Sequence, residues 1–202
     1  MFKAPYYSKE VLRGKAAAFL AEHNPDGTIP VDIELIVEAK FGMDIVPIPG
    51  LQDRIEAVAC ITRDLQAILV DEFVYSHRVN RYRFSLAHEL AHRLLHREQW
   101  QEIQFHDIAS WKEAVGRTIP EREYGFVEFH ANFFAGLVLV PPANLRTSFD
   151  RCVDHAKQQG IDITDEASGA QVIVEGYIAK EFEVSADVVH RRLDADGLWK
   201  CG

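Results

Sequence analysis

The sequence predicts an α+β fold in which helices pack around a small three-stranded sheet. Three short β-rich runs, at residues 44–48, 57–62 and 66–70, are separated by polar or Gly/Pro breaks and predict the sheet. Apolar residues at helical spacing, before and after these runs, predict the helices. A chain of 202 residues can bury a full core. We expect one domain over residues 1–142 and a helical extension over 143–202 that packs on it.

Most of the predicted helices have a recognisable start or stop in the sequence. They cover residues 8–23, 31–41, 79–100 and 123–140, with two or three more within 143–194. The first stops before the turn at residues 24–27 (NPDG). The second has Pro30 in its first turn and Gly42 just past its end. Residues 101–121 are mixed and loop-like, and Pro141 ends the helix that follows them.

Composition excludes several classes of protein. The chain has 22 basic and 31 acidic residues, a net charge of −9, which disfavours binding to nucleic acid by bulk electrostatics. No run approaches the about 20 apolar residues of a membrane helix, and the first residues lack the apolar core of a secretory signal. The cysteines are widely spaced, which disfavours a disulfide scaffold or a thiolate zinc site. We expect a cytoplasmic protein without a membrane segment, in which Cys60 is a small buried apolar residue.

Residues 88–92 form the motif HELAH. Four residues apart on a helix, His88 and His92 project from one face, where two imidazoles can hold one divalent ion with Glu89 beside them to polarise a water. These side chains lie between an apolar sector and a solvent-like edge of the helix, as cleft-lining residues should. The alternative is a surface helix that carries histidines by chance. His96 continues the strip but lies about 12 Å along the axis from His88, so we expect it to be structural or to support a ligand.

A third ligand is expected on the helix at residues 123–140. Catalytic zinc sites usually take three protein ligands and leave one position for water. This helix is apolar almost all the way round, so an ionised Glu128 needs a strong partner, and a metal ion supplies one. Asn132 shares its face and would hydrogen-bond a ligand histidine or the carboxylate. His130 points about 200° away and is rejected as a ligand. The alternative for Glu128 is a buried ion pair with an arginine.

Two segments closely resemble the ImmA/IrrE metallopeptidases. Residues 81–96 (RYRFSLAHELAHRLLH) resemble the active-site segment of that family. Residues 128–135 (EFHANFFA), followed by an apolar run that ends at Pro141, are similar to its second motif. His130 departs from the pattern, because a second acidic residue is common at its place. The similarity extends over residues 29–142.

The resemblance implies a zincin-like core with His88, His92 and Glu128 as metal ligands and Glu89 as the general base. One zinc ion is expected, although manganese and other divalent ions also bind two histidines and a carboxylate. The resemblance also implies a regulatory protein substrate, such as a transcriptional repressor or an antitoxin.

Residues 177–193 are typical of a helix, a tight turn and a second helix with Ser185 as its N-cap. One interpretation is a helix-turn-helix that contacts DNA through His190, Arg191 and Arg192. The segment also carries several acidic residues, so a helical hairpin that packs on the catalytic core is favoured and direct DNA binding is not expected. Such a hairpin would help to recognise a protein substrate.

Three hypotheses follow for the function. The first is a metal-dependent endopeptidase in which Glu89 takes a proton from the attacking water and returns it to the leaving amine. Tyr124 and His96 are candidates for stabilising the oxyanion. The second is a catalytically silent zincin-like module that acts by docking to protein or DNA. The third is a metallohydrolase for a small molecule, which would have a narrow closed pocket in place of an extended groove.

Overall fold

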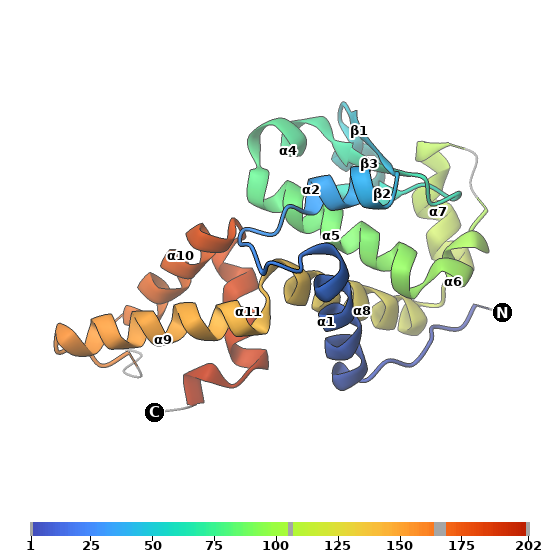
Figure 1. Cartoon of the computed structure of the whole chain (residues 1–202). Coiled ribbons are helices and arrows are strands. Elements are labelled where there is room, and N and C mark those ends of the chain that lie inside the picture. Colours follow the sequence, from blue (N-terminus) through green and yellow to red (C-terminus); the bar gives the residue numbers. More distant parts are fainter. Residues whose placement is uncertain (1, 105–106, 164–168, 201–202) are drawn as a thin grey trace.

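The computed structural model describes residues 2–104, 107–163 and 169–200. In this part of the chain, helices surround a three-stranded sheet, which confirms the predicted α+β fold (Figure 1). In chain order the elements are α1 (Lys9–His23), α2 (Ile33–Leu35), the π-helical turn η1 (Ile36–Lys40), β1 (Asp44–Ile48), α3 (Leu51–Ile55), β2 (Ala59–Ile61), β3 (Ala67–Asp71), α4 (Glu72–His77), α5 (Val79–Leu95), α6 (Arg97–Gln101), α7 (Ile108–Thr118), α8 (Glu121–Leu139), α9 (Pro142–Gln158), α10 (Ala170–Phe182), α11 (Ala186–Ala195) and the 3-10 turn η3 (Leu198–Lys200).

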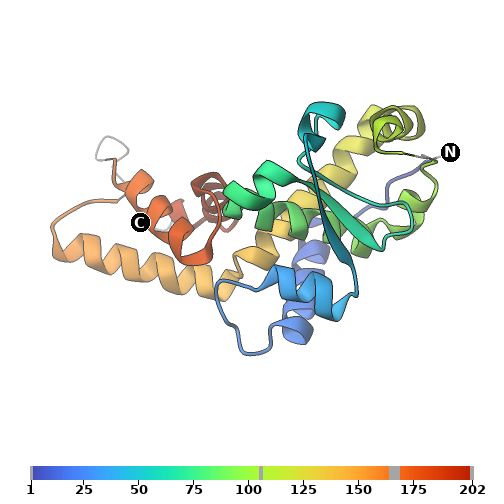
Figure 2. The same ribbon diagram turned by 90° about the horizontal axis from the view of Figure 1, so that it is seen from above.

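The sheet has the strand order β1-β3-β2. Strand β1 runs parallel to β3, with Asp44 opposite Ala67, and β2 runs antiparallel to β3, with Cys60 opposite Leu69. The central strand β3 is held from both sides, and Ile68 at its middle is fully buried. Strand β2 therefore forms one edge of the sheet, and this edge lies over α5 (Figure 2).

Helices α5 and α8 form the centre of the core. Leu86 and Leu90 of α5 are buried, and so are Ala131 and Ala135 of α8. The small alanine side chains let the two helix backbones approach closely, as interdigitating helix faces require. Helix α5 thus has the sheet on one side and α8 on the other (Figures 1 and 2).

The long helix predicted over residues 79–100 is divided at His96. Helix α5 ends at Leu95, His96 has the non-helical angles φ −132° and ψ 24°, and α6 starts at Arg97. A straight helix would place the Trp100 side chain about 12 Å along the axis from His92. The break instead lets Trp100 bury its ring against His92, with 3.9 Å between ring centroids. Burial of this large ring favours the broken helix over a continuous one.

The loop-like stretch predicted at residues 101–121 contains a helix, α7, so this prediction was wrong. Asp107 and Ser110 form a capping box at its start. Trp111, Ala114 and Val115 are buried along one side at helical spacing. The capping box and this short apolar stripe are the sequence signals that were missed.

The second predicted helix, over residues 31–41, is shorter and less regular than expected. Helix α2 begins at Ile33, capped by the Asp32 side chain, and its continuation η1 is a π-helical turn. Gly42 lies just past the end with φ +59°, as its place in the sequence predicted. The short helices α3 and α4 had not been predicted.

The C-terminal helices pack on the preceding part of the chain through α11. Ser185 caps α11 by accepting a hydrogen bond from the Val188 amide, which confirms the predicted N-cap. Arg192 is buried at 3% exposure, where its side chain donates to the Val140 carbonyl and to Asp196. In the opposite direction, the Asn80 side chain donates to the Val184 carbonyl. Helices α9 and α10 extend away from the sheet (Figure 1).

Within the described residues, no single helix is both long and apolar enough to cross a membrane. Helices α8 and α9 meet that measure of length and composition only as a pair, bent by 62° at their junction.

Candidate metal centre

Two neighbouring turns of α5 present His88 and His92 on the same side. Their Nε2 atoms lie 3.0 Å apart. The His88 side chain is 14% exposed and that of His92 only 1%, so the pair sits at the boundary between core and pocket. This is the placement that the four-residue spacing predicted.

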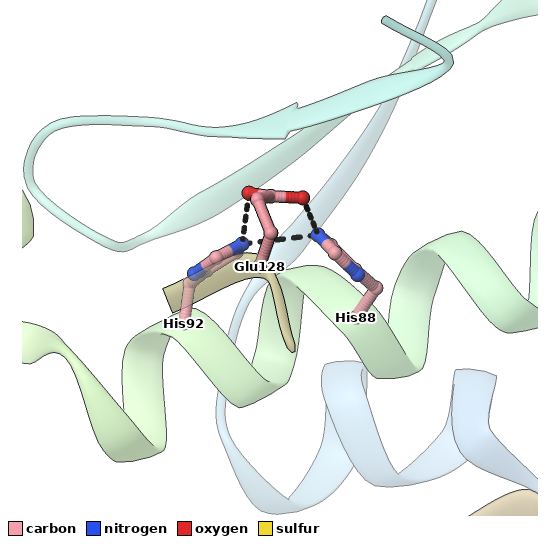
Figure 3. A group of neighbouring side chains, drawn as sticks. All are labelled: His88, His92 and Glu128. Atoms are coloured by element: carbon pink, nitrogen blue, oxygen red, sulfur yellow. Dashed lines mark hydrogen bonds and ion pairs between the residues drawn. The ribbon is translucent and has the colours of Figure 1, made fainter. Parts of the chain in front are cut away.

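Glu128 of α8 completes a group of three donors. Its Oε2 lies 3.4 Å from His88 Nε2 and its Oε1 lies 3.4 Å from His92 Nε2 (Figure 3). One donor atom from each residue falls within 4.8 Å of the others. The Glu128 side chain is 28% exposed, so it is less deeply buried than the apolar character of its helix suggested.

The separation of these donors suits a metal ion. With zinc–nitrogen bonds of about 2.0–2.1 Å and tetrahedral angles, two ligand atoms lie about 3.3 Å apart. The three distances of 3.0, 3.4 and 3.4 Å cluster around that value. Two imidazoles and one carboxylate are also a donor set found in catalytic zinc sites. The residues present therefore fit one divalent ion.

The protonation states of His92 and Glu128 also suit metal binding. Burial lowers the pKa of His92 to about 4, despite the opposing effect of Glu128. Burial also lowers the pKa of His88, but the Glu128 and Glu89 carboxylates outweigh it and raise this pKa above its usual value. For Glu128, burial raises the pKa, while the two adjacent histidines outweigh it and hold the pKa far below its ordinary range. A neutral His92 and an ionised Glu128 are the forms that bind a cation.

Asn132 lies one turn after Glu128 on α8 and contacts His88. Its Oδ1 is 3.2 Å from His88 Nδ1. Because an amide oxygen only accepts, the His88 proton belongs on Nδ1, which leaves Nε2 free to bind an ion.

Glu89 is held by the edge strand β2. Its Oε2 accepts a hydrogen bond from the Ile61 amide at 2.9 Å, and the residue is only 7% exposed. Burial and the nearby Glu128 carboxylate raise the pKa of Glu89 to about 7, although His88 and the Ile61 amide act in the opposite direction. A carboxylate with a pKa near 7 can both take and return a proton at neutral pH.

A pocket of about 190 Å³ opens over these residues. Its lining includes Tyr124 and Trp111, together with Glu89 and the three donor residues. Burial, with the Glu128 and Glu89 carboxylates nearby, raises the pKa of Tyr124, so its hydroxyl stays protonated and can donate. His96 is fully buried behind His92 and is absent from the pocket lining, so it does not face the position where an oxyanion would form.

Two contributors to the pocket were not identified from the sequence. Trp100 stacks on His92 with an interplanar angle of 23° and restrains its ring. Residues 57–59, at and before the start of β2, also line the pocket. The aromatic richness of residues 97–127 was the available signal for Trp100, but only the break at His96 brings this ring to the site.

Comparison with known families agrees with this geometry. The IrrE N-terminal-like domain of peptidase family M78 matches residues 73–194, more than half of the chain. The chain belongs to this family. The matched range of this M78 family member includes α5, which carries HELAH, and α8, which carries Glu128, and it continues into α11. The resemblance to the ImmA/IrrE metallopeptidases is thereby confirmed. No curated protein matches the chain.

Proposed function

We propose that this M78 family peptidase is a zinc-dependent endopeptidase whose ion is held by His88, His92 and Glu128. One observation carries the proposal: three donors converge at the spacing of zinc ligands in the same pocket that Glu89 lines. Manganese or another divalent ion could occupy the same donors.

The chemistry is divided between the ion and the side chains around it. A bound divalent ion would polarise the scissile carbonyl and lower the pKa of a water molecule. Glu89 takes the proton of the attacking water and then gives it to the leaving amine, and the Ile61 amide keeps its carboxylate in place for both steps. The protonated Tyr124 hydroxyl, at the same pocket, donates a hydrogen bond to the oxygen that becomes negative.

The edge of β2 at Ala59, which pairs with no other strand of the sheet, supports a peptide as the substrate. The Val58 carbonyl accepts from the Asp71 amide, and the Thr62 amide donates to the Ala67 carbonyl. The backbone N–H and C=O groups of the even-numbered residues in this segment therefore point toward β3. Alternation then turns the backbone groups of Ala59 away from the sheet, at the side that lines the pocket. An extended peptide can pair with such an edge as an additional strand.

The space beside the metal centre also favours a peptide over a small molecule. Phe84 lines both the 190 Å³ pocket and a neighbouring one of about 520 Å³ between α8 and α11. A chain bound at the ion therefore has room to continue along α8.

We propose a regulatory protein in the cytoplasm, such as a transcriptional repressor or an antitoxin, as the substrate. This part of the proposal rests on the resemblance of residues 81–96 and 128–141 to the ImmA/IrrE enzymes. The basic residues of α11 support a protein partner over DNA. His190 pairs with Glu175, Arg191 pairs with Asp187, and Arg192 is buried against Asp196. Side chains paired in this way are poorly placed to neutralise phosphates.

Replacement of Glu89 by Gln tests the proposal. The amide oxygen of Gln still accepts the Ile61 hydrogen bond, so the fold and the metal centre should persist while the base is lost. With a co-expressed repressor-like protein that the wild type cleaves as substrate, we expect Glu89→Gln to slow cleavage by at least about 100-fold.

The matched control is Glu121→Gln, which removes a carboxylate from the exposed first turn of α8 and should cut at the wild-type rate. Cleavage by Glu89→Gln at the wild-type rate would contradict the assigned role of Glu89.

A further inference from the structure

A row of buried imidazoles continues from the metal centre into the core. His92 Nδ1 lies 3.2 Å from His96 Nδ1, and His96 Nε2 lies 3.3 Å from His130 Nδ1. His96 is 0% exposed and His130 is 3% exposed, so water does not compete for these contacts. The His130 ring also contacts the Tyr7 ring. The row thus links a metal-facing residue to the segment that precedes α1.

The metal end of the row sets the direction of its hydrogen bonds. His92 faces His88 and Glu128 with Nε2, so as a metal ligand it keeps its proton on Nδ1 and donates it to His96 Nδ1. A neutral imidazole has one N–H, so His96 carries its proton on Nε2 and donates to His130 Nδ1. His130 Nδ1 is then an acceptor, and the proton of His130 lies on Nε2.

We propose that His96 and His130 are positioning residues, which hold His92 in the tautomer and orientation of a metal ligand through this one-way chain of hydrogen bonds. The proposal rests on the proposed function, because it concerns how the same three donors bind an ion. It gives His92 a partner comparable to the Asn132 side chain that contacts His88. Partners of this kind are carboxylates, carbonyls or waters in most metal sites. Here the partner of His92 is an imidazole, which is itself held by a second imidazole.

Ring packing keeps the row in register. The His96 and His130 rings stack with centroids 5.5 Å apart, and the Tyr7 ring meets the edge of His130 at 5.3 Å. The N-terminal segment is tied to the core at two further points: the Ala4 amide donates to Glu123 and the Tyr7 hydroxyl donates to the Leu95 carbonyl. The residues before α1 therefore belong to the support of the metal centre.

The affinity for zinc, measured by competition with a chromophoric chelator, tests the role of the row. His96→Leu keeps a bulky side chain but removes the acceptor for His92, and we expect zinc affinity to fall about 10–100-fold. His96→Gln should restore most of it, because an amide oxygen can accept from His92 while the amide nitrogen donates to His130. His130→Phe keeps an aromatic ring but removes the acceptor for His96. His92 still has His96 as its partner, so zinc affinity should fall by a smaller factor than in His96→Leu.

The matched control is Phe134→Leu, a buried change one turn further along α8, where the Phe134 ring packs against Phe19. It should leave zinc affinity unchanged. If the wild-type chain does not bind zinc, the proposed function fails. If the wild type binds zinc and His96→Leu and His130→Phe bind it equally well, the proposed function stands and the positioning role is overturned.

Long-range proton–nitrogen NMR correlations on the zinc-loaded wild type give a second test that needs no variant. They distinguish the two tautomers of each imidazole. We expect the proton on Nδ1 of His92 and on Nε2 of His96 and His130. A proton on Nδ1 of either His96 or His130 would reverse a hydrogen bond and overturn the proposal.

Discussion

At the scale of single residues, each reactive side chain of the site is held by one specific partner. The Ile61 amide holds Glu89, Asn132 holds His88, and His96 holds His92. The partners come from β2, from α8 and from the end of α5, so three elements must be in place before the site has its geometry. The Cys60 thiol of β2 also lies close to Glu89, because Cys60 directly precedes Ile61, whose amide holds the Glu89 carboxylate.

The Cys60 thiol should be unreactive in the folded protein. Burial at 2% exposure, with a further contribution from Glu89, raises the pKa of Cys60, so almost no thiolate forms at neutral pH. Cys152 is half-buried, and burial raises its pKa less. With iodoacetamide and mass spectrometry, we expect Cys60 to be alkylated at least about 10-fold more slowly than Cys152. In the denatured protein, the two cysteines should be alkylated at equal rates. Equal rates in the native protein as well would show that β2 opens readily.

At the scale of elements, the site depends on the close packing of α5 on α8. The sequence could predict this part, because His88 and His92 are fixed by helical spacing and Glu128 is a charged residue on an apolar helix. It could not predict the break at His96, because the residues on both sides are good helix formers and only the burial of Trp100 favours the break. The contact of His96 with His130 was missed for the same reason, since it joins two different helices.

Two glycines of α8 provide a matched test of how tightly α11 packs on this helix. A Cβ at Gly125 would meet no atom within 4 Å, so Gly125→Ala should raise the free energy of unfolding by about 0.5–1 kcal/mol. A Cβ at Gly136 would lie 3.2 Å from Arg192 Cδ, so Gly136→Ala should lose that gain or reduce stability. Urea unfolding measures both. An equal gain in the two variants would show that Arg192 is not held against α8.

At the scale of the whole molecule, the segments that enclose the site come from both ends of the chain. Residues 2–8 contact the end of α5, where the Tyr7 hydroxyl donates to the Leu95 carbonyl. Helix α11 packs against α8 beside the pocket of about 520 Å³. Apolar periodicity identifies which face of a helix is buried, but it does not say which distant segment covers that face. For this reason the sequence predicted the helices of the C-terminal extension and the N-cap at Ser185, but not the buried Arg192 against Gly136.

The metal content of three purified proteins tests the central claim most directly. The wild type, Glu89→Gln and Glu128→Gln should be prepared identically and analysed by elemental mass spectrometry. We predict about one zinc per chain in the wild type and in Glu89→Gln, because both keep all three donors. We predict less than about one tenth of that in Glu128→Gln, since a neutral amide replaces the ionised ligand. A full equivalent of zinc in Glu128→Gln would contradict the three-ligand site.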